Sequence, residues 1–222
     1  LFRKEFLQIL RVMIWITVPI VVVCFFARGY LARMIFSRDA PEIAAIFGFL
    51  CLAIFFRVVY AIVSRYFYAQ KDTWTPLIVS VVAIGLNVVL AWQLSRPQNY
   101  GVAGLAMAQS IVASVEVVIL SIVMLVKDKK LFDRDFIDGI WQILSITGFS
   151  IVAAYIMVSL LPLSSNDTGF VALGFKLGMI TLVTGTVHIG LSNLFGLKEA
   201  IPVVRKLKLL AKSVLKPVRI EW

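Results

Sequence analysis

Long apolar runs separated by short polar breaks extend along the whole chain. A hydrocarbon core about 30 Å thick is crossed by roughly 20 apolar residues at helical rise, so runs near that length are expected to span a membrane. Six such runs occur, at residues 12–35, 42–66, 75–95, 101–126, 139–161 and 171–195. We expect each to form a transmembrane helix, since the runs lack the alternation of barrel strands.

The polar breaks have the chemistry of turns and helix starts. Residues 38–41 (RDAP), 72–76 (DTWTP) and 95–99 (SRPQN) precede the second, third and fourth runs. Proline in the first turn of a helix loses no hydrogen bond. The pattern divides the chain into an amphipathic lead-in (1–11), a four-helix part (12–126), a charged loop (127–138), a two-helix hairpin (139–195) and a basic tail (196–222).

The tail has two faces at helical spacing. The apolar face holds Val203, Leu207, Leu210 and Val214, and the basic face holds Arg205, Lys208, Lys212 and Lys216. This pattern predicts a helix lying in the membrane interface, where each basic residue adds about 1 kcal/mol near anionic lipid.

Composition supports a lipid environment. Of the 222 residues, 61% are apolar and 15% are charged, whereas soluble domains contain about half apolar and a quarter charged residues. We therefore predict an all-α, polytopic membrane bundle. The two cysteines lie in apolar runs and there is one histidine, so we expect no disulfide, no metal site and no cofactor. The first residues show no signal-peptide cleavage site, and we expect the chain to begin within a longer protein.

Basic residues predict the orientation, because cytoplasmic loops carry the excess of Lys and Arg. With both termini in the cytoplasm, 16 of the 22 basic residues lie inside. Those outside are Arg28, Arg33, Arg38, Arg96 and Lys176, and Arg57 lies within a run. These positions leave nucleic-acid binding as a poor explanation of the net charge of +10.

Arg57 is the first candidate for function. At mid-membrane an arginine costs at least about 2.5 kcal/mol, which favours a water-filled cavity or an anionic partner. Tyr60, Ser64 and Tyr68 follow it on one helical face, with Arg65 beside them. This stripe is a candidate path for an anionic headgroup, and a snorkelling or structurally paired arginine is the alternative.

Other polar residues within the runs have both structural and functional interpretations. Glu116, a carboxylate deep in a run, is expected either to neutralise Arg57, as a structural ion pair, or to bind a cation or proton. Asn87 fits a hydrogen bond across helices better than an ion site. Gly174, Gly178 and Gly185 share nearly one face, which lets another helix or a lipid chain approach closely, and helix packing is the default interpretation. The pair His188 and Ser192 is too little for a proton relay.

One block of sequence resembles a known family. Residues 65–76 (RYFYAQKDTWTP), a following run with Asn87 (GLNVVL), and residues 101–110 (GVAGLAMAQS) resemble the MurJ/MviN lipid II flippases of the multidrug/oligosaccharidyl-lipid/polysaccharide exporter superfamily. The matching motif positions are Phe67, Tyr68, Asp72, Thr73, Thr75, Pro76 and Asn87. The resemblance extends over nearly the whole chain.

The resemblance implies the last six of fourteen transmembrane helices, with the first lobe supplied elsewhere in the same protein. It further implies alternating access, lipid II as the partner, cavity arginines that hold pyrophosphate, and a groove for the lipid tail between 139–161 and 171–195. Arg57 is a candidate for such an arginine. The loop RMIFSRDAPE is shorter than the usual hairpin, and Ala91 supplies no carboxylate where some members bind sodium. Ion coupling is therefore not carried over.

The resulting expectation is a multi-pass protein of the bacterial inner membrane that flips lipid II and is not an enzyme. One alternative is a flippase for another polyprenyl-linked polysaccharide precursor. Another is a membrane scaffold that recruits cell-wall enzymes and transports nothing itself. An intramembrane enzyme is disfavoured, because the clustered His, Asp or Ser groups that it needs are missing from the sequence.

Overall fold

All six apolar runs form helices in the computed structural model of the chain, which describes residues 2–36, 39–129, 131–164, 167 and 169–214. The described helices are α1 (Phe2–Phe26), α2 (Arg28–Ile35), α3 (Ala40–Ala69), α4 (Trp74–Leu94), α5 (Val102–Lys127), α6 (Arg134–Leu160), α7 (Phe170–Leu194) and α8 (Ala200–Val214). Six of them, all except α2 and α8, are long and apolar enough to cross a membrane. The described residues include no strand, so the predicted polytopic helical bundle is confirmed.

The first helix differs from the predicted run 12–35 at both ends. Helix α1 begins at Phe2, and its first turns are buried through Phe6, Leu7 and Leu10, which pack against the end of α3. The charged residues Arg3, Lys4 and Glu5 that precede them are exposed, so the amphipathic lead-in is part of α1. The chain leaves helical geometry at Ala27 and restarts as the more polar α2.

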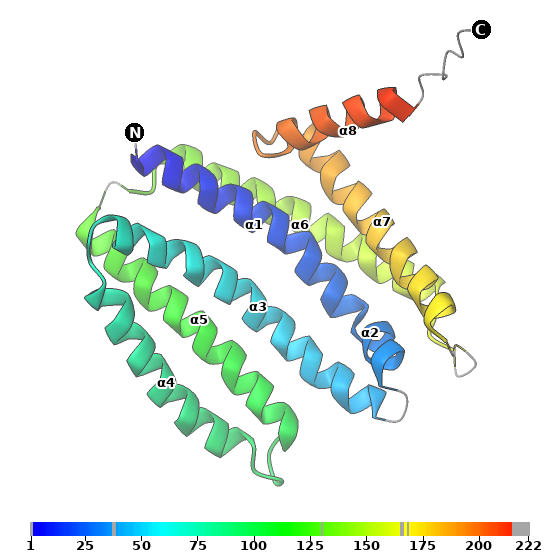
Figure 1. Cartoon of the computed structure of the whole chain (residues 1–222), viewed down its shortest axis with the longest axis horizontal. Coiled ribbons are helices and arrows are strands. Elements are labelled where there is room, and N and C mark those ends of the chain that lie inside the picture. Colours follow the sequence, from blue (N-terminus) through cyan, green and yellow to red (C-terminus); the bar gives the residue numbers. More distant parts are fainter. Residues whose placement is uncertain (1, 37–38, 130, 165–166, 168, 215–222) are drawn as a thin grey trace, which may run out of the picture.

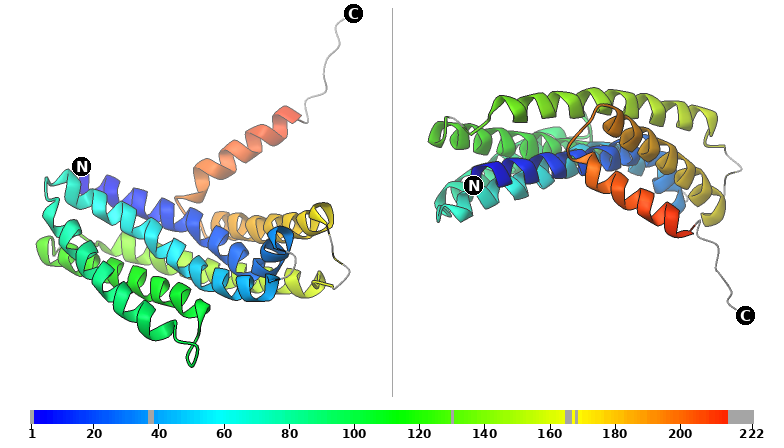
Figure 2. Two further views of the ribbon diagram at one scale, coloured as in Figure 1. Left: turned by 60° about the horizontal axis from the view of Figure 1, so that its bottom comes forward. Right: turned by 90° about the horizontal axis from the view of Figure 1, so that it is seen from above.

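Helix α1 lies between two groups of helices (Figure 1). On one side, α3 packs against α1 and α5, and α5 in turn carries α4. On the other side, α6 and α7 pack against each other and against α1. Helix α8 contacts α7 and projects away from the bundle, as the left view in Figure 2 shows. The bundle is therefore a row of helices in which α4 is an edge helix.

The helix directions sort the loops to two ends of the bundle. The amino-terminal turn of α1, the α3–α4 turn, the α5–α6 loop and the α7–α8 turn lie at one end, and α2 with the α4–α5 and α6–α7 loops lies at the other (Figure 1). The basic residues assigned to the cytoplasm lie at the first end or on α8, within the part of the chain that the structure describes. Arg38, Lys130, Lys216 and Arg219 lie outside the described residues. Which end faces the cytoplasm stays a prediction from charge.

Two smaller predictions have different outcomes. The basic tail is helical over Ala200–Val214, as its periodicity predicts, although the side chains at 207, 208 and 210–214 lie outside the described part. The close helix packing expected at Gly174, Gly178 and Gly185 is wrong within the described structure, because a Cβ at any of them would meet no atom within 4 Å. Helix α7 approaches its neighbours through its other faces, with Leu173 and Ile180 buried.

A close backbone approach holds the α4–α5 hairpin together. The chain turns after Leu94, and Gly101 adopts φ 55° just before α5 begins. A Cβ on Gly104 would lie 2.1 Å from the carbonyl oxygen of Leu94. Glycine at this position therefore lets the first turn of α5 pass the last turn of α4.

We expect Gly104→Ala to destabilise the protein by about 1–3 kcal/mol, because the obstructing atoms are backbone and cannot rotate away. Gly85→Ala is the matched control on α4, where a Cβ would meet nothing within 4 Å and alanine favours the helix. Thermal unfolding in detergent measures both variants. Equal stability of the two variants would contradict the assigned role of Gly104.

Candidate functional site

Four side chains form a hydrogen-bonded network across α3, α4 and α5. Nη1 of Arg57 lies 3.2 Å from Oε2 of Glu116. The Ser80 hydroxyl donates to Oε1 of the same carboxylate over 2.9 Å, and the Tyr60 and Ser80 hydroxyls are 2.6 Å apart. Both carboxylate oxygens are thus engaged, one by a cation and one by a hydroxyl.

The two charged members of this network differ in exposure. The Glu116 side chain is 3% exposed, whereas that of Arg57 is 45% exposed. Both lie about 16–18 Å from the nearer end of their helices at 1.5 Å per residue, which is near the middle of a bilayer core. A buried carboxylate is stable at this depth because its partners replace water. The guanidinium of Arg57, fixed in place by Glu116, therefore presents a positive charge at the surface of the bundle.

A groove leads from the α3–α4 turn toward the network. It has a volume of about 580 Å³, and its lining consists of Tyr60, Tyr68, Thr73, Trp74, Pro76, Leu77 and Ser80. Tyr60 and Ser80 belong to both the groove and the network. The groove thus connects the polar turn with hydroxyl groups that contact the carboxylate partner of Arg57.

The remaining members of the predicted polar stripe lie apart from the network. Ser64 is buried, and its hydroxyl has no hydrogen-bond partner in the described structure. Arg65 is exposed and lines a separate hollow between α1 and α3. The structure therefore brings Arg57, Tyr60 and Glu116 together but does not add Ser64 and Arg65 to them.

Several motif residues organise the α3–α4 turn. Asp72 accepts a hydrogen bond from the Thr75 backbone N–H over 3.0 Å and from the Thr75 hydroxyl over 2.6 Å, so it caps α4.

Lys127, at the end of α5, pairs with Asp72 and lies over the buried ring of Phe67. The Lys127 ammonium, followed by the Thr75 donors, holds the pKa of Asp72 well below its usual range. These residues tie the turn to α5, while Thr73, Pro76 and Tyr68 line the groove.

Asn87 has a packing partner on the next helix. Its side-chain amide donates to the side-chain oxygen of Gln109, joining α4 to α5 nearer the opposite end of the bundle. This bond agrees with the packing role that the sequence favours. Within the described part of the chain, no three His, Cys, Asp or Glu side chains converge where they could hold a metal ion.

Ser80 was missed by the sequence reasoning, although a signal for it exists. Ser80 and Asn87 are seven residues apart on α4, which places both polar groups on one helical face. That face points toward α5, where Glu116 and Gln109 lie. A search for pairs of small polar residues two turns apart would have identified it.

A second polar cluster joins α1, α6 and α7, and the sequence reasoning singled out only two of its members, His188 and Ser192. His188 is buried, and its Nδ1 lies 2.9 Å from the Ser150 hydroxyl. Trp15 donates its indole N–H to the Ser192 hydroxyl over 2.8 Å, and its ring packs against the His188 ring. His188 thus pairs with Ser150, and Ser192 serves Trp15. These contacts attach α7 to both α6 and α1.

Comparison with protein-family models gives a match over residues 1–181, to the family described as lipid II flippase MurJ. The matched residues include all of α1 to α6 and the first part of α7, and therefore the whole network around Glu116. A search of curated proteins finds no relative that matches the chain.

We expect Glu116→Ala to cost about 2–3 kcal/mol, because it removes one of the two partners of the Ser80 hydroxyl and the charge that Arg57 faces. Glu116→Gln retains an acceptor for Ser80 and should cost about half as much. Glu42→Ala, at an exposed carboxylate in the first turn of α3, is the control and should be neutral. Unfolding in detergent would measure all three, and an unaffected Glu116→Ala protein would show that the network is not stabilising.

Proposed function

Since the chain belongs to the MurJ lipid II flippase family, we propose that it is the C-terminal portion of a flippase that moves lipid II across the bacterial inner membrane by alternating access. The family match over residues 1–181 is the observation on which this proposal rests. The six long apolar helices supply the membrane-spanning scaffold that such a protein needs. The first lobe of the transporter would be contributed by the same protein.

Arg57 is proposed as a contact for the pyrophosphate of the cargo. Arginine offers a planar set of donors that suits phosphate oxygens. Glu116 fixes one end of the guanidinium from inside the bundle, while nearly half of the side chain is exposed. The hydroxyls of Tyr60 and Ser80 and the adjoining groove add a polar path toward the α3–α4 end. This combination suits reversible binding of an anion more than a sealed structural ion pair.

The helix pair α6 and α7 is proposed to guide the lipid tail. The pair packs on α1, whereas the polar network lies among α3, α4 and α5 on the far side of α1. Only 22% and 17% of the most apolar windows of α6 and α7 are buried within the chain, so both present broad apolar surfaces. Such surfaces suit a polyprenyl chain, whereas Arg57 suits a headgroup.

The proposed orientation follows from charge. The end that holds the α3–α4 turn and the start of α1 and α6 has the basic excess and is assigned to the cytoplasm. A groove that opens at this end would receive a precursor made on the cytoplasmic side. A flippase for another polyprenyl-linked precursor would share this geometry, and rescue of a defined lipid II defect separates the two cargoes.

Complementation tests the proposal directly. We expect the full-length gene that encodes this chain to rescue cells depleted of their own lipid II flippase. Arg57→Ala should lower lipid II transport about tenfold or more, since a charged hydrogen bond contributes about 1.5–3 kcal/mol. Arg96→Ala is the matched control, because Arg96 is exposed in the α4–α5 turn and stacks on Trp92.

Two outcomes would count against this proposal. Failure of the wild-type gene to rescue, despite normal membrane levels of the protein, would reject lipid II as the cargo. Full rescue by Arg57→Ala would reject the assigned role of Arg57 but leave the cargo in place. Immunoblots of membrane fractions keep both outcomes separate from poor expression.

Water access at position 57 can be measured by thiol labelling. In a protein whose Cys24 and Cys51 have been replaced, Arg57→Cys should react with a hydrophilic maleimide added from the cytoplasmic side. Ser64→Cys, two turns along the same helix but buried, should react at least about tenfold more slowly. Equal protection of both positions would mean that Arg57 faces lipid or packed protein instead of a water-filled path.

A further inference from the structure

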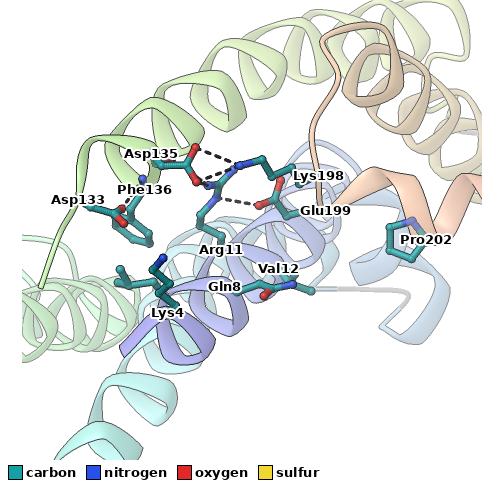
Figure 3. Close-up of a pocket in the computed structure, with 11 residues that line it drawn as sticks. Lys4, Gln8, Arg11, Val12, Asp133, Asp135, Phe136, Lys198, Glu199 and Pro202 are labelled. Atoms are coloured by element: carbon teal, nitrogen blue, oxygen red, sulfur yellow. Dashed lines mark hydrogen bonds and ion pairs between the residues drawn. The ribbon is translucent and has the colours of Figure 1, made fainter. Parts of the chain in front are cut away.

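A second ionic cluster joins three helices at the end of the bundle assigned to the cytoplasm (Figure 3). Arg11 of α1 donates from Nη1 to the backbone oxygen of Asp135 in α6 over 3.0 Å. Its Nε lies 2.7 Å from Oε1 of Glu199, in the turn between α7 and α8. Lys198 contacts both carboxylate oxygens of Asp135 at 3.1 Å. The cluster thus connects α1 with the start of α6 and the start of α8.

The fold makes room for this cluster at one glycine. A Cβ on Gly139 would lie 2.1 Å from the central guanidinium carbon of Arg11. The guanidinium therefore occupies the space that a side chain on α6 would fill, and Arg11 is only 7% exposed. Arg11 and Glu199 form the buried floor, while the side chains of Asp135 and Lys198 remain 68% and 71% exposed.

A pocket of about 420 Å³ adjoins the cluster. Its charged lining residues are Lys4, Arg11, Lys198, Asp133, Asp135 and Glu199. Three cations and three carboxylates give the lining no net charge. A ligand with both a positive and a negative group would meet complementary partners here, whereas a purely anionic ligand would also meet the carboxylates.

Two buried atoms of residues that line the pocket, Nε of Arg11 and Oε2 of Glu199, have no hydrogen-bond partner in the described structure. Glu199 is 5% exposed, and its Oε1 pairs with Arg11, but its Oε2 has no hydrogen-bond partner in the described structure. A buried carboxylate oxygen without a donor is costly, so a ligand that supplies one would be favoured. An ammonium group donates hydrogen bonds and carries the matching charge. The exposed Lys4 at the same pocket suits a phosphate.

An apolar surface continues from the pocket along α1. A shallow hollow shares Gln8 and Val12 with the pocket and extends to Ile9 and Met13. Ile9, Met13, Ile16 and Ile20 follow one another at helical spacing and are 38–56% exposed. A polar pocket at the ends of the helices, followed by an apolar stripe toward the membrane centre, matches the order of headgroup and acyl chains in a phospholipid.

We propose that this pocket binds the headgroup of an amine-bearing zwitterionic phospholipid, phosphatidylethanolamine, from the cytoplasmic leaflet. Its ammonium donates to Oε2 of Glu199, its phosphate lies near Lys4, and an acyl chain follows the exposed stripe of α1. The lipid then contacts α1, α6 and the α7–α8 turn together. The site is independent of the cargo and of Arg57, which lies in a different group of helices.

Native mass spectrometry of the full-length protein tests this site with headgroups of graded methylation. The probes are phosphatidylethanolamine, its N-methyl and N,N-dimethyl forms, and phosphatidylcholine, all with the same acyl chains. Each methyl group removes one N–H donor while the phosphate stays constant. We expect the bound fraction to fall at each step, by about fivefold or more across the series.

Substitutions assign the two ends of the headgroup. Glu199→Gln should reduce the preference for phosphatidylethanolamine over phosphatidylcholine to less than about twofold. Lys4→Ala should weaken both lipids equally, and Lys129→Ala, an exposed lysine in the α5–α6 loop, should weaken neither. If Glu199→Gln fails to fold, the methylation series in the wild-type protein still tests whether the pocket recognises the ammonium group.

Three results would overturn the proposal. Equal retention of all four lipids would show that the amine is not recognised. Tighter binding of phosphatidylglycerol with the same chains would show that the pocket acts as a basic site. Displacement of the lipid by an equal concentration of free phosphoethanolamine would show that the acyl chains contribute nothing and that the ligand is the soluble zwitterion. A rescue-competent protein without lipid preference would reject this site alone and leave the proposed flippase function in place.

Discussion

Lipid supplies no hydrogen bonds, and the structure meets this constraint by pairing polar side chains across helices. The carboxylate of Glu116 accepts hydrogen bonds from Arg57 of α3 and Ser80 of α4, and the side-chain amide of Asn87 donates to Gln109 of α5. The Trp15 indole donates a hydrogen bond to Ser192 of α7. These three polar groups, placed inside runs of apolar residues, thus specify neighbouring helices, which apolar packing against equally apolar lipid would specify less strongly.

These polar pairs fall into two sets, and α1 belongs to one set and packs against α3 of the other. One set joins α3, α4 and α5 around Glu116, and the other joins α1, α6 and α7 around His188. Apolar contacts of Phe6, Leu7 and Leu10 with the end of α3 connect the two sets. The arrangement keeps the charge at Arg57 away from α6 and α7, which expose many large apolar side chains. A cargo with a charged head and a long hydrocarbon tail would meet two chemically different regions of one chain.

The sequence was sufficient to predict the helices but not to predict which helices pack against one another. Length and hydropathy predicted the six long apolar helices that the structure describes. The DTWTP segment predicted the turn before α4, the helix that Asp72 caps. The start of α1 was misjudged because hydropathy counts charges without knowing that the apolar residues between them face α3. Ser64 and Arg57 share a face by angle alone, yet the long arginine reaches the surface while the short serine is covered. Pairings such as Arg11 with Glu199 depend on how helices far apart in sequence are arranged, and no local pattern encodes that arrangement.

The burial of Arg11 also has a consequence for biosynthesis. This arginine leaves the ribosome before its partners, which are the Asp135 carbonyl, 124 residues later, and Glu199, which is later still. Until both have been made, its guanidinium has to remain among water and headgroups, since a lone cation in hydrocarbon is costly. The amino-terminal end of α1 can therefore take its final position only after α7 has been inserted, so α1 is translated before α6 and α7 but reaches its final position after them.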